Sequence, residues 1–150
     1  MEFILLSIQL EKRISFTTKL NEYDVENSYL CVPGEYNCDI FYDDNRNIAK
    51  IILNHPHYGL FIPEKLKTIY CTLSNSNSYI VIGDDDKFFR SNGVKLNRED
   101  NIKFVLASQY IAASTLIPYH QTQIDVSTCK NSDGLITALV IDFNYTSLIF

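Results

Sequence analysis

Two of the three histidines stand close together, in the segment His55-Pro56-His57. Two imidazoles in one extended segment can face the same zinc or iron ion, but such an ion needs a third and a fourth ligand. Residues of suitable type elsewhere in the chain are His120, Asp84 and Cys71. The spacing of these residues in the sequence does not identify any of them as a metal ligand. The competing interpretation is a proline-kinked loop in which one histidine is exposed and the other packs on Tyr58 or Phe61. We favour this loop and predict a protein without a bound metal or cofactor.

Carboxylates also occur side by side, in the run Asp84-Asp85-Asp86. Adjacent acids can hold Mg²⁺ or take part in acid–base catalysis. Their position between two predicted strands instead favours a solvated hairpin turn. The run 43–47 has Asp and Asn at the spacing of the first calcium ligands, but Ile48 and Asn54 stand where a calcium loop requires Gly and Glu. We interpret this run as an ordinary polar turn.

Motifs for catalysis are lacking along the whole sequence. The five glycines lie too far apart to form a loop that cradles phosphate, which excludes the common nucleotide-binding motifs. No serine or cysteine stands in a local context that activates a nucleophile. We therefore favour a function other than catalysis. The alternative is a small enzyme whose site is scattered in the sequence around His55 and His57.

The acidic residues are concentrated in one segment, Asn21 to Asn47. This segment holds seven acids and one base, Arg46, so it carries −6, and the rest of the chain carries +1 because the total is −5. Tyrosines are interleaved with the acids at positions 23, 29, 36 and 42. Acids attract a cationic partner and tyrosines anchor interfaces. The competing interpretation is a solvated acidic face that only confers solubility.

The segment predicts a small acidic binding or inhibitory protein that neutralises a basic partner protein, as an immunity protein or an antitoxin does. A toxin nuclease is one such partner. The predicted partner-binding residues are Glu22, Asp24, Glu26, Glu35, Tyr36, Asp39, Tyr42, Asp43 and Asp44. A further alternative is a structural subunit that associates with copies of itself through the apolar stretch Leu148-Ile149-Phe150.

Charge and hydropathy exclude other partners. A net charge of −5 without a basic cluster argues against binding to nucleic acid. The longest apolar runs, 3–6 and 135–141, are much shorter than the roughly 18 to 20 residues that a membrane helix needs. The start of the chain has no export-signal pattern, so we expect a cytoplasmic protein. The four cysteines, Cys31, Cys38, Cys71 and Cys129, are therefore expected to be thiols, mostly buried.

Two helices are predicted. The stretch Asn97 to Ile117 is hydrophobic almost all round, with Asn97 as a possible N-cap and Pro118 as a stop, so it predicts a long buried helix. Pro63 at a first helical position predicts a second, short helix from Glu64 to Leu73.

The remaining pattern predicts strands joined by short turns. The expected strands are Phe3–Leu10 and Arg13–Leu20 as a hairpin turning at Glu11 and Lys12, Tyr29–Val32, Cys38–Tyr42 paired with Ile48–Leu53, Tyr79–Ile82 with Lys87–Arg90 returning after a turn, and Thr122–Cys129 paired with Leu135–Phe143. We expect the last strand, the most hydrophobic, to lie at or near the sheet centre. The predicted fold is a single α+β domain, 1–150, with a mostly antiparallel sheet and the long helix packed on it.

Overall fold

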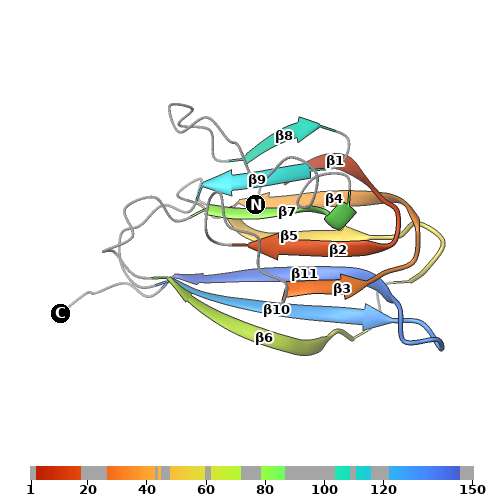
Figure 1. Ribbon diagram of the computed structural model, residues 1–150. Helices are drawn as coiled ribbons and strands as arrows, with labels where there is room; N and C mark the ends of the chain where they lie inside the picture. The colour runs from red at the N-terminus through yellow and green to blue at the C-terminus, as the bar shows by residue number, and fades with distance from the viewer. Residues whose placement is uncertain are drawn as a thin grey trace.

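The structure is a computed structural model that describes residues 3–17, 27–42, 44, 48–59, 62–71, 79–86, 104–108, 111–115 and 122–145. These residues form eleven β-strands and no α-helix (Figure 1). Every pairing between the strands is antiparallel. In this part of the chain, no helix has the length and hydropathy that a bilayer crossing requires.

The larger sheet, sheet A, has six strands in the order β1-β4-β5-β11-β10-β6. Their bounds are Phe3–Leu10 for β1, Gly34–Tyr42 for β4, Ile48–Asn54 for β5, Ile136–Tyr145 for β11, Thr122–Lys130 for β10 and Glu64–Cys71 for β6. The predicted pairing of β4 with β5 and the predicted hairpin of β10 with β11 are both confirmed. The hydrophobic strand β11 lies between β5 and β10, inside the sheet as expected.

The smaller sheet, sheet B, has five strands in the order β3-β2-β7-β9-β8. Their bounds are Ser28–Leu30 for β3, Arg13–Thr17 for β2, Tyr79–Asp84 for β7, Ile111–Thr115 for β9 and Phe104–Ser108 for β8. One hydrophobic cluster contains side chains from both sheets, among them Phe16 and Ile82 of sheet B and Ile40 and Leu139 of sheet A. The two sheets therefore enclose a common core, as in a β-sandwich.

The α+β prediction with two helices is wrong. Residues 64–71 of the expected short helix form strand β6, and the expected long helix, Asn97 to Ile117, contains strands β8 and β9. A run that is apolar on all sides fits a buried strand as well as a buried helix, because neither periodicity is visible in it. Pro63 is likewise tolerated directly before an edge strand. The other residues of 97–117 lie outside the described part of the chain.

The link Glu11-Lys12 is a corner between the sheets and not the expected hairpin. Strand β1 pairs with β4 in sheet A, whereas β2 pairs with β3 and β7 in sheet B. The backbone N–H of Glu11 donates to Oδ1 of Asp84 at 2.6 Å, and the Ser15 hydroxyl donates to Oδ1 of Asp85 at 2.6 Å. Asp84 and Asp85 are 1% and 0% exposed, so the predicted solvated turn is wrong for both. Through these hydrogen bonds, Asp84 and Asp85 hold the end of β7 against the link between β1 and β2.

Candidate protein-binding face

Side chains alternate between the two faces of sheet A, as the pleat of a strand requires. In β4 the buried residues are Tyr36, Cys38 and Ile40, and in β10 they are Ile124 and Val126. The residues between them point away from the core and form what we call the outer face. The outer-face residues of β4, β5, β10 and β11 include Glu35, Asn37, Asp39, Phe41, Lys50, Ile52, Asn54, Gln123, Asp125, Ser127 and Asp142.

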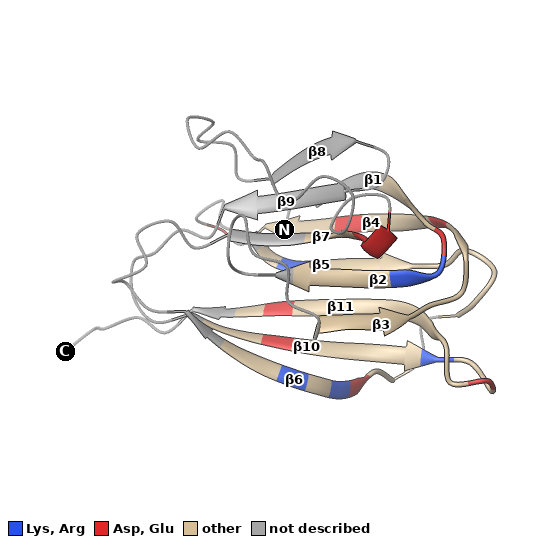
Figure 2. Cartoon of the chain, in the orientation of Figure 1, with Lys and Arg blue, Asp and Glu red and all other residues tan. Residues whose placement is uncertain are grey.

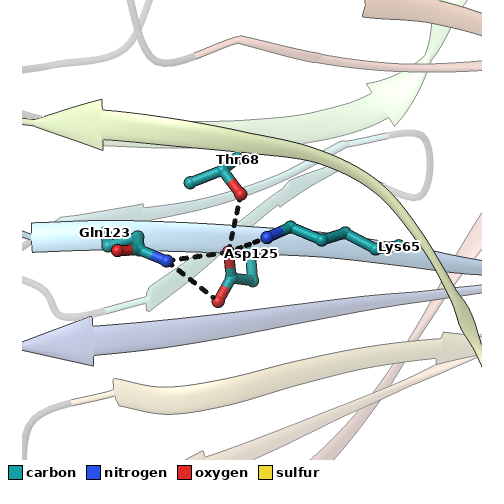
Figure 3. A network of polar contacts seen from close by, with 4 residues as sticks. All are labelled: Lys65, Thr68, Gln123 and Asp125. Atoms are coloured by element: carbon teal, nitrogen blue, oxygen red, sulfur yellow. Dashed lines mark hydrogen bonds and ion pairs between the residues drawn. The ribbon is translucent and has the colours of Figure 1, made fainter.

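At the β6 side of the outer face, Asp125 is surrounded by donors (Figure 3). The Thr68 hydroxyl donates to Oδ1 at 2.8 Å, and the Gln123 amide donates to both carboxylate oxygens at 3.1 and 3.3 Å. The Lys65 ammonium lies 3.5 Å from Oδ1. The hydrogen bonds from Gln123 and Thr68, assisted by the Lys65 charge, hold the pKa of Asp125 below its ordinary value. This carboxylate is fully engaged within its own sheet.

In the middle of the outer face, Asp142 of β11 pairs with Lys50 of β5. The Lys50 ammonium lies 3.4 Å from Oδ1 of Asp142. The Lys50 side chain is 43% exposed and the Asp142 side chain 38%. An ion pair so open to solvent contributes little to folding, typically about 0 to 1 kcal/mol. It nevertheless neutralises the charge of Asp142 towards an approaching molecule.

At the β4 side of sheet A, three of the described acids form what we call the β4 acid row: Glu35 and Asp39 on the outer face of β4, and Asp44 in the turn that follows the strand. Glu35 and Asp44 are exposed, and Asp39 is half-buried. Strand β4 carries no Lys or Arg, whereas β5 and β6 carry Lys50, Lys65 and Lys67 (Figure 2). Among the described residues, no cation lies within ion-pair distance of the row. The row therefore presents uncompensated negative charge.

Asp39 has an unusual environment within the row. Its Oδ1 atom is buried and receives no hydrogen bond from the described residues. The residues opposite it on the neighbouring strands are Leu5 of β1 and Ile52 of β5, neither of which has a polar side chain. Burial raises the pKa of Asp39 above its ordinary value of 3.8. A second outer-face acceptor, Oδ1 of Asn54, is buried without a donor in the same part of the structure.

The predicted binding residues do not all reach this face. Glu22, Asp24, Glu26 and Asp43 lie outside the described residues, as do Leu148 to Phe150. Tyr36 is 0% exposed, and its hydroxyl donates to the Val32 carbonyl at 2.6 Å and lies 3.1 Å from the Ile136 carbonyl. It is a core residue and cannot contact a partner. Tyr42 is half-buried and packs against the core.

The sequence contained the signal that separates these residues. A strand places every second residue on one face, so Tyr36 and Tyr42 must lie opposite Glu35 and Asp39. The aromatic residue on the same face as the acids is Phe41, which is half-buried and was missed. The partners of Asp125 were missed as well, because they come from a strand that was expected to be a helix.

The histidine segment has a structural role. His55 is 6% exposed, and its ring meets those of Tyr36 and Tyr58 edge-on at 5.2 Å between centroids. Its Nδ1 accepts from the His57 backbone N–H at 3.2 Å, so its Nε2 is the donor to the Pro33 carbonyl at 3.0 Å. His57 is exposed. This is the expected loop with one packed histidine, and both nitrogens of that ring are occupied.

Gly34 leaves room for the His55 ring. Its φ is 140°, and a Cβ atom added there would lie 2.7 Å from Nε2 of His55. A side chain at position 34 would therefore displace the ring from the Pro33 carbonyl. The close approach explains why glycine stands where the chain passes from sheet B into sheet A.

A small pocket lies between β6 and β10. The pocket measures about 180 Å³ and is lined by Ile62, Glu64, Thr128, Cys129 and Lys130. This volume is below the roughly 300 Å³ at which ligand pockets begin. Within the same part of the chain, no three His, Cys, Asp or Glu side chains are grouped so as to hold a metal ion. Cys31, Cys38 and Cys129 are buried thiols outside any disulfide, as predicted, and burial raises the pKa values of Cys31 and Cys38 to about 12.

Comparisons with known proteins were made at three levels. No protein-family model matches the chain, and searches of curated proteins and of solved structures gave no significant match. The outer face of sheet A is therefore interpreted from its own geometry and charge.

Proposed function

We propose that this protein binds and neutralises a basic partner protein through the β4 acid row, in the manner of an immunity protein or an antitoxin. The observation that supports the proposal is the contrast in charge across the outer face. Asp125 and Asp142 are compensated by Lys65 and Lys50, whereas no cation among the described residues lies within ion-pair distance of the row; Lys50, opposite Phe41 on β5, is paired with Asp142. Uncompensated carboxylates on one strand and in the turn after it attract a cationic surface and accelerate its association.

A nuclease toxin is a partner of suitable chemistry. A protein that binds phosphate carries a basic surface, and an acidic row that covers this surface competes with the nucleic acid. The proposal places the protein in the cytoplasm, and the three buried thiols are the form expected of cysteines in a reducing compartment. The acids at 22, 24, 26 and 43 add further negative charge to the same segment of sequence.

The test compares two charge reversals of equal size. The first variant, Glu35→Lys with Asp44→Lys, reverses the exposed ends of the row. The control, Glu64→Lys with Asp133→Lys, reverses two exposed acids outside β4. Immobilised parent and variants are exposed to extract of the source cells, retained proteins are identified, and association kinetics are measured with the purified candidate at low and high salt.

We expect a basic protein that associates with the parent and the control rapidly at low salt and more slowly at high salt. The row variant should associate on the order of tenfold more slowly at low salt, with an unchanged thermal melt. Equal association of the row variant and the control would overturn the proposal.

A further inference from the structure

The two sheets end in four edge strands, β1 and β6 in sheet A and β3 and β8 in sheet B. Three of these edges carry a feature that hinders pairing with another chain. Strand β6 follows Pro63 directly, contains Lys65 and Lys67, and has an irregular register with β10. Strand β3 is three residues long, and β8 has an irregular register with β9. Prolines, charges, bulges and short length are the features by which natural proteins protect a sheet edge.

Strand β1 has none of these features. Its eight residues, FILLSIQL, include no charge, proline or glycine, and they pair with β4 in an unbroken register. Among the described strands, β4 alone pairs with β1, although β7 and β9 of sheet B also lie close to it. Successive residues of a strand direct their N–H and C=O groups to opposite sides, so every second residue of β1 directs these groups away from β4. This edge can therefore accept one more strand.

The strand that fits this edge is β1 of a second copy. A two-fold axis perpendicular to the sheet brings two β1 strands together antiparallel and keeps the core side of both copies on one side of the joined sheet. Because β1 is uncharged, this pairing places no like charges opposite each other.

The acids of β4 do not prevent the pairing. Glu35 and Asp39 lie one strand further in than β1. In the joined sheet the acids of the two copies are therefore three strand spacings apart, at least about 14 Å. This separation exceeds the roughly 8 Å over which exposed charges act at physiological salt.

We propose that this protein forms a symmetric dimer in which the β1 strands of two copies pair and join their A sheets into one continuous sheet. The dimer does not depend on the proposed function, because no other protein takes part in it. It does affect that function, since both β4 acid rows then lie on one outer face. The backbone pairing persists at high salt, whereas the attraction of a cationic partner by the rows weakens.

The experiment measures the mass of the full chain by sedimentation equilibrium over a range of concentrations, at low and high salt. The parent should approach twice the 17.3 kDa of one chain at both salt concentrations. Ser7 lies near the middle of β1, so Ser7→Lys brings two like charges together near the two-fold axis and should weaken association at least about tenfold. Asn37→Lys is the matched control, because the exposed Asn37 lies opposite Ser7 on β4, one strand away from the contact. This control should associate as the parent does.

Amide hydrogen exchange of the parent identifies the edge that pairs. The amides of β1 that point away from β4 should exchange more slowly as the protein concentration rises, because dimerisation gives them acceptors. The amides on the outer edge of β6 should exchange at a rate that does not change with concentration. This measurement needs no variant, so it tests the dimer even if Ser7→Lys does not fold.

The outcomes that would overturn the dimer are specific. A parent that stays monomeric at every concentration, or that forms assemblies larger than two chains, contradicts it. Equal association of Ser7→Lys and Asn37→Lys, or β1 exchange that does not slow with concentration, places the contact on another surface and contradicts it as well. Thermal melts verify that each variant is folded. None of these results affects the proposed function, which is tested by the association of the row variant with a basic protein.

Discussion

Asp125 and Asp39 lie on the same face of the same sheet, yet their surroundings have opposite effects on their charge. Asp125 receives hydrogen bonds from Thr68 and Gln123 and lies beside Lys65, and its pKa is lowered. Asp39 stands between Leu5 and Ile52 with a buried oxygen that lacks a donor, and its pKa is raised. The sheet stabilises one carboxylate and leaves the other poorly solvated. Acidity in the sequence therefore does not show which acids are available to a partner.

The largest expected effect concerns the assignment of the two faces of β4. Tyr36→Ala removes a fully buried ring and leaves the Val32 carbonyl without its donor, so it should lower the free energy of unfolding by about 3 kcal/mol or more. The exposed neighbour Asn37 provides the control, since Asn37→Ala should change stability by less than about 0.5 kcal/mol. Denaturant unfolding measures both values. A denaturation midpoint for Tyr36→Ala equal to that of the parent would mean that Tyr36 does not face the core.

The second prediction tests the engaged carboxylate. Asp125→Asn should lower the melting temperature by a few degrees at pH 7, because Lys65 loses its counter-charge and the donors of Thr68 and Gln123 lose a charged acceptor. A lowered pKa means that this stabilisation is present above the unfolded-state value near 3.8 and is lost as pH falls through the folded-state value. The difference in melting temperature between parent and variant should therefore shrink as pH falls below 3.8. A difference that does not shrink would contradict the charge-based explanation.

The third prediction has the opposite sign. A raised pKa means that the folded state holds the Asp39 proton more firmly than the unfolded state, so the parent loses stability as pH rises above about 3.8 towards the folded-state value. Asp39→Asn should melt a degree or two higher than the parent at pH 7 and equally below about pH 3. Thermal melts across this range measure the crossover. A variant less stable than the parent at pH 7 would show that Asp39 has a stabilising partner.

The smallest effect is expected for the ion pair between Lys50 and Asp142. Lys50→Met removes the cation from an exposed ion pair, so stability should change by less than about 0.5 kcal/mol. Freed from Lys50, Asp142 should then strengthen the attraction of the outer face for a cationic peptide such as hexa-lysine. Unchanged affinity for this peptide would show that Lys50 does not mask the charge of Asp142.

Local patterns in the sequence predicted those parts of the fold that depend on neighbouring residues. The β10–β11 hairpin is such a part, because its turn contains Gly134 with φ 79° and Asn131, whose side-chain oxygen accepts from the N–H groups of Asp133 and Leu135. The pairing of β4 with β5 is another part of the fold that the local sequence pattern predicted. The packed histidine also followed from its loop and the nearby tyrosine.

Features that depend on distant residues were not predictable in this way. Asp84 and Asp85 look like turn residues until Glu11 and Ser15, more than 60 residues earlier in the sequence, are placed beside them. Residues 104–108 and 111–115 have a hydrophobic pattern that a helix and a buried strand share, and pairing with β7 decides between them at the second segment. The acids of the candidate face were identified, but the orphan oxygen of Asp39 depends on residues from neighbouring strands.

The corner at Glu11-Lys12 affects how the chain folds during synthesis. Strands β1, β2 and β5 each find one partner nearby in the sequence, namely β4, β3 and β4. On its other side, β2 must wait for β7, and the bonds from Glu11 and Ser15 close loops of 73 and 70 residues. Strand β5 likewise waits for β11, formed by residues 136–145, on its other side. Sandwiches built on such distant pairings fold in milliseconds to seconds, and their unpaired strands are exposed to aggregation until then. The sandwich closes only after β7 and β11 have been made, so the free edges of β2 and β5 stay open to pairing with another chain until that point.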